Sequence, residues 1–201
     1  MTLQKRTVLE RWDISPEELT EVIEEKPSLR GILLGYVAEV KLRGLFMSKN
    51  EITRITKHDD HDRRKKGDLI VTYKGHDFVI ECKSLQTNSI SKEGDRYWGK
   101  AQCDASDRRT IPLPDGSTVS TTNLLAGEFD VLAVNLFAFE EKWRFVFAKN
   151  GDLPRSRFRS YTPDQRQYLL ATLVNVCWPP EPPFWANPFS LLDEMIQERI
   201  E

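Results

Sequence analysis

The 201-residue sequence contains few of the features that mark membrane, secreted or zinc-binding proteins. It has three cysteines, Cys82, Cys103 and Cys177, and their spacing is not that of a zinc site. No apolar run approaches the length of a membrane span, and the first residues lack the apolar stretch of a signal peptide. We therefore expect free thiols and a cytoplasmic location.

The sequence also lacks an excess of positive charge, because 29 Lys and Arg are set against 31 Asp and Glu, for a net charge of −2. Without a global basic field, any nucleic-acid partner has to be met by a local basic patch. The hydrophobic share of 39% is typical of a soluble globular protein. The length fits one domain over residues 1–201, with a core over about 29–150 and a helical extension over about 151–201.

Two short apolar runs near the middle of the chain predict an antiparallel hairpin. Leu69–Tyr73 and Phe78–Ile80 are rich in β-branched and aromatic residues, and the link between them contains Gly75. Runs of this kind, joined by a short glycine-containing link, are typical of paired strands.

Three charged residues lie at one end of this predicted hairpin. Because strand side chains alternate between faces, Glu81 and Lys83 share one face, and Asp68 comes within reach from the start of the first strand. Two neighbouring carboxylates in a buried position are costly unless a cation neutralises them, and oxygen ligands suit Mg²⁺ or Mn²⁺. A lysine beside the metal can orient or deprotonate a water. The alternative is a solvated strand end with an ordinary ion pair.

Two helices are expected before the hairpin. A capping box beginning at Ser15 predicts a helix that ends before Pro27, and a second helix follows over residues 29–43. Glu39 lies beside the apolar stripe of the second helix and could face inward, but an exposed Glu39 paired with Arg43 fits equally well. The stripe consists of Leu33, Leu34, Tyr36, Val37 and Val40.

Several further elements follow from local patterns. We expect a first strand within residues 45–55, a solvated loop of His, Asp and basic residues over 57–66, and a buried strand over 129–139 paired with 143–148. An extended aromatic segment over 178–185 precedes a last amphipathic helix.

Basic and amide side chains gather in two segments. Residues 96–109 are compatible with a helix, and a basic stripe alternates over residues 155–159. Contact with a phosphate backbone is one interpretation of these segments, and simple solvation is the other. The DNA-contacting candidates are Lys100, Gln102, Arg108, Arg109, Arg155, Arg157 and Arg159.

The order of these elements resembles that of the PD-(D/E)XK nuclease superfamily, over about residues 31–109. The resemblance implies an α/β restriction-endonuclease-like fold, a mixed β-sheet core flanked by helices, and phosphodiester cleavage that depends on Mg²⁺, with Mn²⁺ as a substitute. By that motif Asp68, Glu81, Glu39 and the backbone carbonyl of Cys82 would bind the metal, and Lys83 would act on the attacking water.

The chain departs from the family pattern at two points. Gly67 stands where the motif name has proline, which contributes no ligand. Gln102 lies where some members carry a glutamine on the following helix, but the tyrosine expected four residues later is Ser106.

The resemblance favours a restriction-type endonuclease that acts on double-stranded DNA as a homodimer, so that both strands are cut. A structure-selective repair or recombination nuclease is the alternative within the same class. A DNA-binding subunit whose own site is idle is the alternative from a different class.

Overall fold

The computed structural model describes residues 6–57 and 67–200. The chain divides into two compact units, residues 1–37 and 38–201. The first unit contains α1 (Val8–Trp12), α2 (Pro16–Glu25) and the beginning of α3 (Pro27–Met47). The expected capping box at Ser15 is confirmed, since its side chain accepts from the backbone of Glu18 at 3.1 Å.

Helix α3 differs from its prediction in both length and orientation. It runs through Gly44 to Met47, and its buried residues are Ala38, Leu42 and Phe46, which are spaced by four. The predicted stripe is wrong, because Val40 is 69% exposed. Apolar residues occur all around this helix, so their spacing alone does not single out the face that packs.

The second unit is built on a five-stranded mixed sheet in the order β1-β2-β3-β8-β9. Strands β3 and β8 are parallel, and the other neighbours are antiparallel. The predicted α/β fold with a mixed sheet is therefore confirmed. The strands are β1 (Ile52–Thr56), β2 (Leu69–Tyr73), β3 (His76–Ser84), β8 (Val131–Asn135) and β9 (Phe145–Lys149).

The predicted hairpin is present as β2 and β3. Its two-residue turn, Lys74 and Gly75, has positive φ at both positions, 48° and 82°. This geometry matches the twist of the flanking strands, and glycine adopts it without a steric penalty. The register places Leu69 opposite Ile80, and this is the last pair before the charged end of the hairpin.

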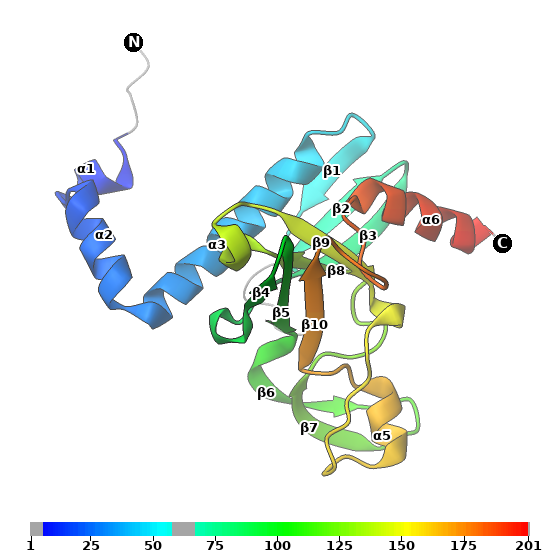
Figure 1. Ribbon diagram of the computed structural model, residues 1–201. Helices are drawn as coiled ribbons and strands as arrows, with labels where there is room; N and C mark the ends of the chain where they lie inside the picture. The colour runs from blue at the N-terminus through cyan, green and yellow to red at the C-terminus, as the bar shows by residue number, and fades with distance from the viewer. Residues whose placement is uncertain (1–5, 58–66, 201) are drawn as a thin grey trace. The chain divides into compact units, whose positions relative to one another are not determined.

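The two faces of the sheet are covered differently (Figure 1). Helices α3 and α6 (Pro188–Ile200) pack on one face, where Phe46, Phe147 and Phe189 meet edge to face. A smaller sheet in the order β10-β5-β4 covers the other face. Its strands are β4 (Ser91–Glu93), β5 (Arg96–Gln102) and β10 (Leu173–Trp178).

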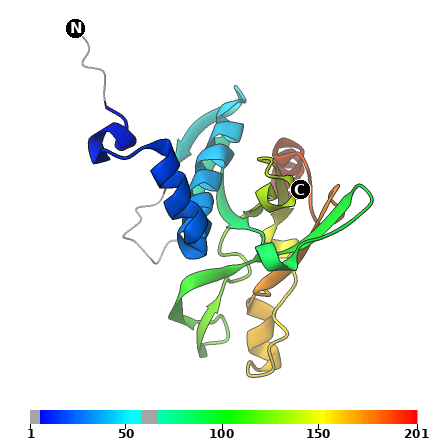
Figure 2. The same cartoon turned by 60° about the vertical axis from the view of Figure 1, so that its left-hand side comes forward.

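The prediction of a helix over residues 96–109 is wrong, because this segment forms β5 and then β6 (Asp104–Pro112). Along β5, Tyr97, Gly99 and Ala101 are buried, and Lys100 is exposed, which is the period of a strand. Strand β6 pairs with β7 (Thr118–Asn123). In Figures 1 and 2 this hairpin and α5 (Pro163–Tyr168) lie below the five-stranded sheet.

Residues 151–200 contribute more than the expected helices, since β10 joins the small sheet and α6 carries buried core residues. The aromatic segment before α6 is extended, and the backbone of Trp185 bonds reciprocally to Phe147 at 2.7 and 2.9 Å. Among the described residues, no helix is long and apolar enough to span a bilayer. The remaining short helices are η1 (Thr87–Ser89), α4 (Phe137–Glu140) and η2 (Asn150–Asp152).

The observed face of α3 predicts how two substitutions on the same helix differ. Phe46 is fully buried, so Phe46→Ala should lower the free energy of unfolding by about 3–5 kcal/mol. Val40→Ala is the control, and it should change that free energy by no more than about 0.5 kcal/mol. Urea unfolding measures both. Equal losses in the two variants would contradict the packing described here.

Candidate active site

The charged end of the β2–β3 hairpin begins where the regular ladder stops. The backbone N–H of Asp68 donates to the carbonyl of Ile80 at 2.8 Å. The side chain of Asp68 then accepts the N–H of Cys82 at its Oδ2 atom, at 2.7 Å. The carboxylate thus takes the place of the next backbone acceptor, and this hydrogen bond fixes it beside β3.

Glu81 and Lys83 lie on the same face of β3, as the sequence predicts. The Nζ atom of Lys83 is 2.6 Å from Oε1 of Glu81, and the N–H of Gly67 donates to Oε2 at 3.1 Å. Glu81 is only 5% exposed. A carboxylate this deeply buried requires such partners, because an unpaired charge in the interior is strongly unfavourable.

Gly67 is needed for this arrangement. Its φ of +100° is a conformation that side chains rarely adopt, and a Cβ atom there would lie 2.2 Å from Cγ1 of Val79. Only glycine lets the backbone approach β3 closely enough to donate to Glu81. The departure from the proline of the motif name therefore has a structural reason in this chain.

The electrostatics of the site follow from burial and from the two acids. Burial, and then the charge of Glu81, raise the pKa of Asp68 to about 7. Burial of Lys83 disfavours its charged form, but the adjacent Glu81 outweighs burial and the pKa of Lys83 is raised. The lysine is therefore an ammonium at neutral pH, and among the described residues no cation forms an ion pair with Asp68.

Two further residues lie within electrostatic reach of this group. The charge of Glu39 on α3 contributes to the raised pKa of Asp68, and Glu39 also forms an ion pair with Lys57 at 3.1 Å. Cys103, directly after β5, has its pKa raised to about 12 by burial, and the charges of Lys83 and Glu81 also act on it. Sequence reasoning missed the proximity of Cys103 because it expected a helix there.

The site is suited to a hard divalent cation. Asp68 and Glu81 offer carboxylate oxygens, and among the described residues no donor contacts the second oxygen of Asp68. Within residues 6–57 and 67–200, no group of three or more His, Cys, Asp and Glu side chains gathers around one metal position. Ligation by Glu39 and by the carbonyl of Cys82 stays a prediction, and residues 58–66 of the expected loop lie outside the described residues.

The basic candidates are distributed over several elements. Lys100 and Gln102 lie on β5, and the amide of Gln102 accepts from Gln86 at 3.0 Å. Arg109 is not free to bind phosphate, because it forms a half-buried ion pair with Glu128 and also donates to the carbonyl of Asn123 at 3.3 Å.

The remaining arginines differ in their partners. Arg108 donates to the carbonyl of Ser120 at 3.1 Å, and Arg155 donates to that of Leu153 at 2.9 Å. Arg157 and Arg159 are exposed. The structure thus does not unite all seven candidates on one element.

Known proteins give little guidance on this site. No protein-family model matches the chain, and no curated protein matches it. The structure is similar to that of a bacterial homing endonuclease, I-Ssp6803I, at 20% sequence identity and a TM-score of 0.35. The match covers 68% of this chain and 86% of that one. Activity is therefore inferred from the site residues and not from this similarity.

The raised pKa of Asp68 predicts how metal-free stability depends on pH. The pKa is 3.8 for an ordinary Asp and about 7 here, so unfolding releases a proton between these values and stability falls as pH rises through them. The loss is at most roughly 4 kcal/mol. In EDTA, Asp68→Asn should raise Tm at pH 8 by several degrees and change it little at pH 4.

The control for this experiment is Asp95→Asn, which alters an exposed turn residue. Its Tm should follow that of the unaltered protein at both pH values. If Asp68→Asn shows the same fall in Tm between pH 4 and pH 8 as the unaltered protein, Asp68 is not the group that causes it.

Proposed function

We propose that the protein is a divalent-metal-dependent endonuclease that hydrolyses phosphodiester bonds of double-stranded DNA. The observation that carries the proposal is the group at the end of the hairpin, with Asp68 beside Glu81 and the ammonium of Lys83 2.6 Å from Glu81. Its two acids and one lysine occur at the spacing of the PD-(D/E)XK motif, with Glu81 and Lys83 on β3 and Asp68 directly before its partner strand β2.

In this mechanism Asp68 and Glu81 would hold Mg²⁺ through their carboxylate oxygens. When bound, the metal would supply charge stabilisation at the scissile phosphate and activate water. The ammonium of Lys83 would orient the attacking water and stabilise the negative charge that develops on the phosphate. The hydrogen bonds from Cys82 and Gly67 keep the two carboxylates in place while this happens.

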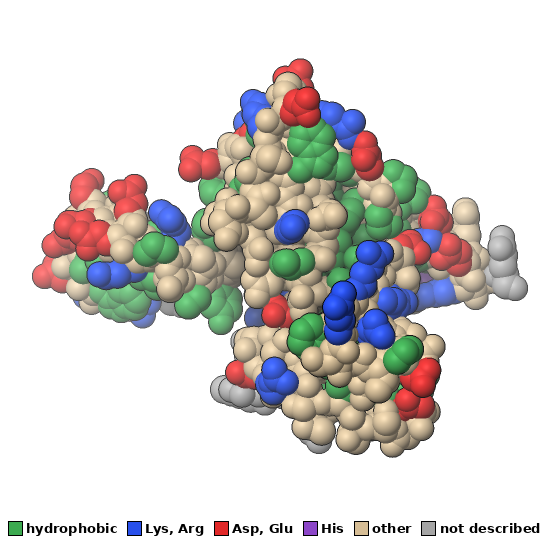
Figure 3. Space-filling model, turned by 60° about the horizontal axis from the view of Figure 1, so that its bottom comes forward, with side chains coloured by type: hydrophobic (Ala, Val, Ile, Leu, Met, Phe, Trp, Pro, Cys, Tyr) green, Lys and Arg blue, Asp and Glu red, His purple; other side chains and the backbone are tan. Residues whose placement is uncertain are grey.

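Local positive charge supports a DNA substrate despite the net charge of −2. Figure 3 shows Lys and Arg side chains gathered on the face turned toward the viewer. Such groups contact phosphates without reading sequence, and they make binding dependent on salt. Action as a homodimer would place two such sites on opposite strands of one duplex, as a restriction-type enzyme needs.

One observation favours a second candidate, a DNA-binding subunit with an idle site. Glu39 is paired with Lys57, and the described residues contain no cluster of three acidic, His or Cys ligands. In that case Lys83 and Glu81 would be a structural ion pair. Cleavage assays separate the two candidates directly.

The proposed role of Lys83 predicts a loss of rate without a loss of affinity. Lys83→Ala should slow cleavage by about a hundredfold or more, because its charge acts in the transition state, and DNA affinity should change little. Single-turnover cleavage of plasmid and linear duplex in Mg²⁺, together with binding in Ca²⁺, measures both quantities. Lys142→Ala, at an exposed lysine far along the chain, is the matched control.

Metal removal is the second arm of this experiment. EDTA should abolish cleavage by the unaltered protein, and added Mg²⁺ or Mn²⁺ should restore it. Cleavage that continues in excess chelator would exclude the metal mechanism. DNA binding without cleavage under every metal condition would establish the idle-site candidate instead.

A further inference from the structure

The pair of strands β5 and β10 presents an unexpected polar face. In their register Lys100 lies opposite Asn175, and Gln102 lies opposite Leu173. The alternate residues, such as Ala101, are buried against the main sheet, so these four side chains point outward. All four are exposed.

The exposed residues have the chemistry that reads base pairs. Among the described residues, the side chains of Lys100 and Asn175 make no hydrogen bond, and Gln102 uses only its carbonyl oxygen. Asn and Gln bond bidentately to adenine, and Lys bonds to guanine, in the major groove. One ammonium and two amides on neighbouring strands thus form a polar surface on which, among the described residues, only the carbonyl oxygen of Gln102 has a partner.

The strand that carries this face also borders the proposed catalytic group. Gln102 is followed by Cys103, on which Lys83 and Glu81 act electrostatically. The N–H of Gln86, three residues after Lys83, donates to the carbonyl of Lys100 at 2.8 Å. Alternate residues of a strand are about 7 Å apart, close to two base-pair steps of about 3.4 Å each. Lys100 and Gln102 are therefore spaced to contact bases about two steps apart, from the side of β5 opposite to the buried Ala101 and Cys103.

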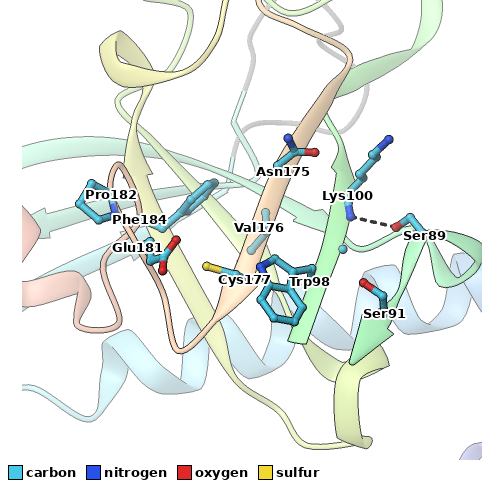
Figure 4. A pocket seen from close by; sticks show the side chains of 11 residues that line it. Ser89, Ser91, Trp98, Lys100, Asn175, Val176, Cys177, Glu181, Pro182 and Phe184 are labelled. Carbon is cyan, nitrogen blue, oxygen red and sulfur yellow. Dashed lines mark hydrogen bonds between the residues drawn. The ribbon is translucent and has the colours of Figure 1, made fainter. Parts of the chain in front are cut away.

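A cavity of about 370 Å³ adjoins this outer face of β5 and β10, toward the end of β5 that is farther from Cys103 (Figure 4). Trp98, Cys177 and Phe184 give it an apolar part, and Asn175 lies at its edge. The N–H of Lys100 donates to Oγ of Ser89 at 2.8 Å, and this bond joins the β5 backbone to the η1 turn. An apolar hollow beside amide groups can receive a thymine methyl group or a deoxyribose.

We propose that the outer face of β5 and β10 is the sequence-reading surface of the protein, with Lys100, Gln102 and Asn175 contacting base edges in the major groove of duplex DNA. This inference rests on the proposed nuclease function and adds to it a specificity surface that is separate from the catalytic group. The face belongs to an antiparallel sheet, and β-sheets are among the elements that read DNA with their strands in a groove.

The test is selection from a duplex library that contains a randomised segment. Protein-bound DNA is recovered in Ca²⁺, and cut DNA is recovered in Mg²⁺. Asn175→Ala and Gln102→Ala should each reduce base preference at one or two positions by about ten- to hundredfold. Asn175→Asp should shift the preference at its position from adenine to cytosine, because a carboxylate accepts from the cytosine amino group.

Gln197→Ala, at an exposed glutamine of α6, is the matched control and should leave the preference unchanged. Far-ultraviolet circular dichroism and Tm verify that each variant is folded. The inference is overturned if the base preference of the unaltered protein persists in all three variants, Asn175→Ala, Gln102→Ala and Asn175→Asp. It is also overturned if the unaltered protein shows no base preference. Base preference in binding without any cleavage would uphold this surface and refute the proposed nuclease function.

Discussion

The placement of two carboxylates at a buried strand end is the constraint on which the rest of this structure depends. Glu81 is almost fully buried, and it is tolerated only because Lys83 and the backbone of Gly67 bond to its two oxygens. Among the described residues no cation pairs with Asp68, and burial together with the charge of Glu81 raises its pKa to about 7. The close approach of Gly67 lets its N–H bond to Glu81, and the N–H of Cys82 bonds to Asp68, so backbone donors hold both acids in place.

The parallel pairing of β3 with β8 explains why the acids are buried at all. Residues 80–84 of β3 pair with residues 131–135 of β8, so the charged end of β3 lies within the sheet and not at its edge. The small sheet then covers that face, and Cys103 comes close to Lys83 through β5. One strand, β5, therefore links the candidate catalytic group to the polar face of Lys100 and Asn175.

Local signals predicted the parts of the fold that depend on local geometry. The turn at Gly75 and the capping box at Ser15 need particular residues, and both were found where expected. The segment 96–109 was predicted wrongly because its charged and amide residues occupy the outward positions of β5 and β6, where they resemble a polar helix face. The strand character of β5 comes from pairing with β10, which lies some seventy residues later and leaves no local trace.

The ion pair between Lys83 and Glu81 links the stability of the site to its proposed chemistry. Without metal, the ammonium of Lys83 lies against Glu81 and offsets part of the cost of two buried acids. A divalent cation held by Asp68 and Glu81 would take over that role, and it would leave the ammonium of Lys83 available to a water or a phosphate oxygen. Under the proposed function, Lys83 would be a structural counter-ion in one state and a catalytic group in the other. The raised pKa of Asp68, caused by burial and by the charge of Glu81, is the feature that would make this exchange favourable.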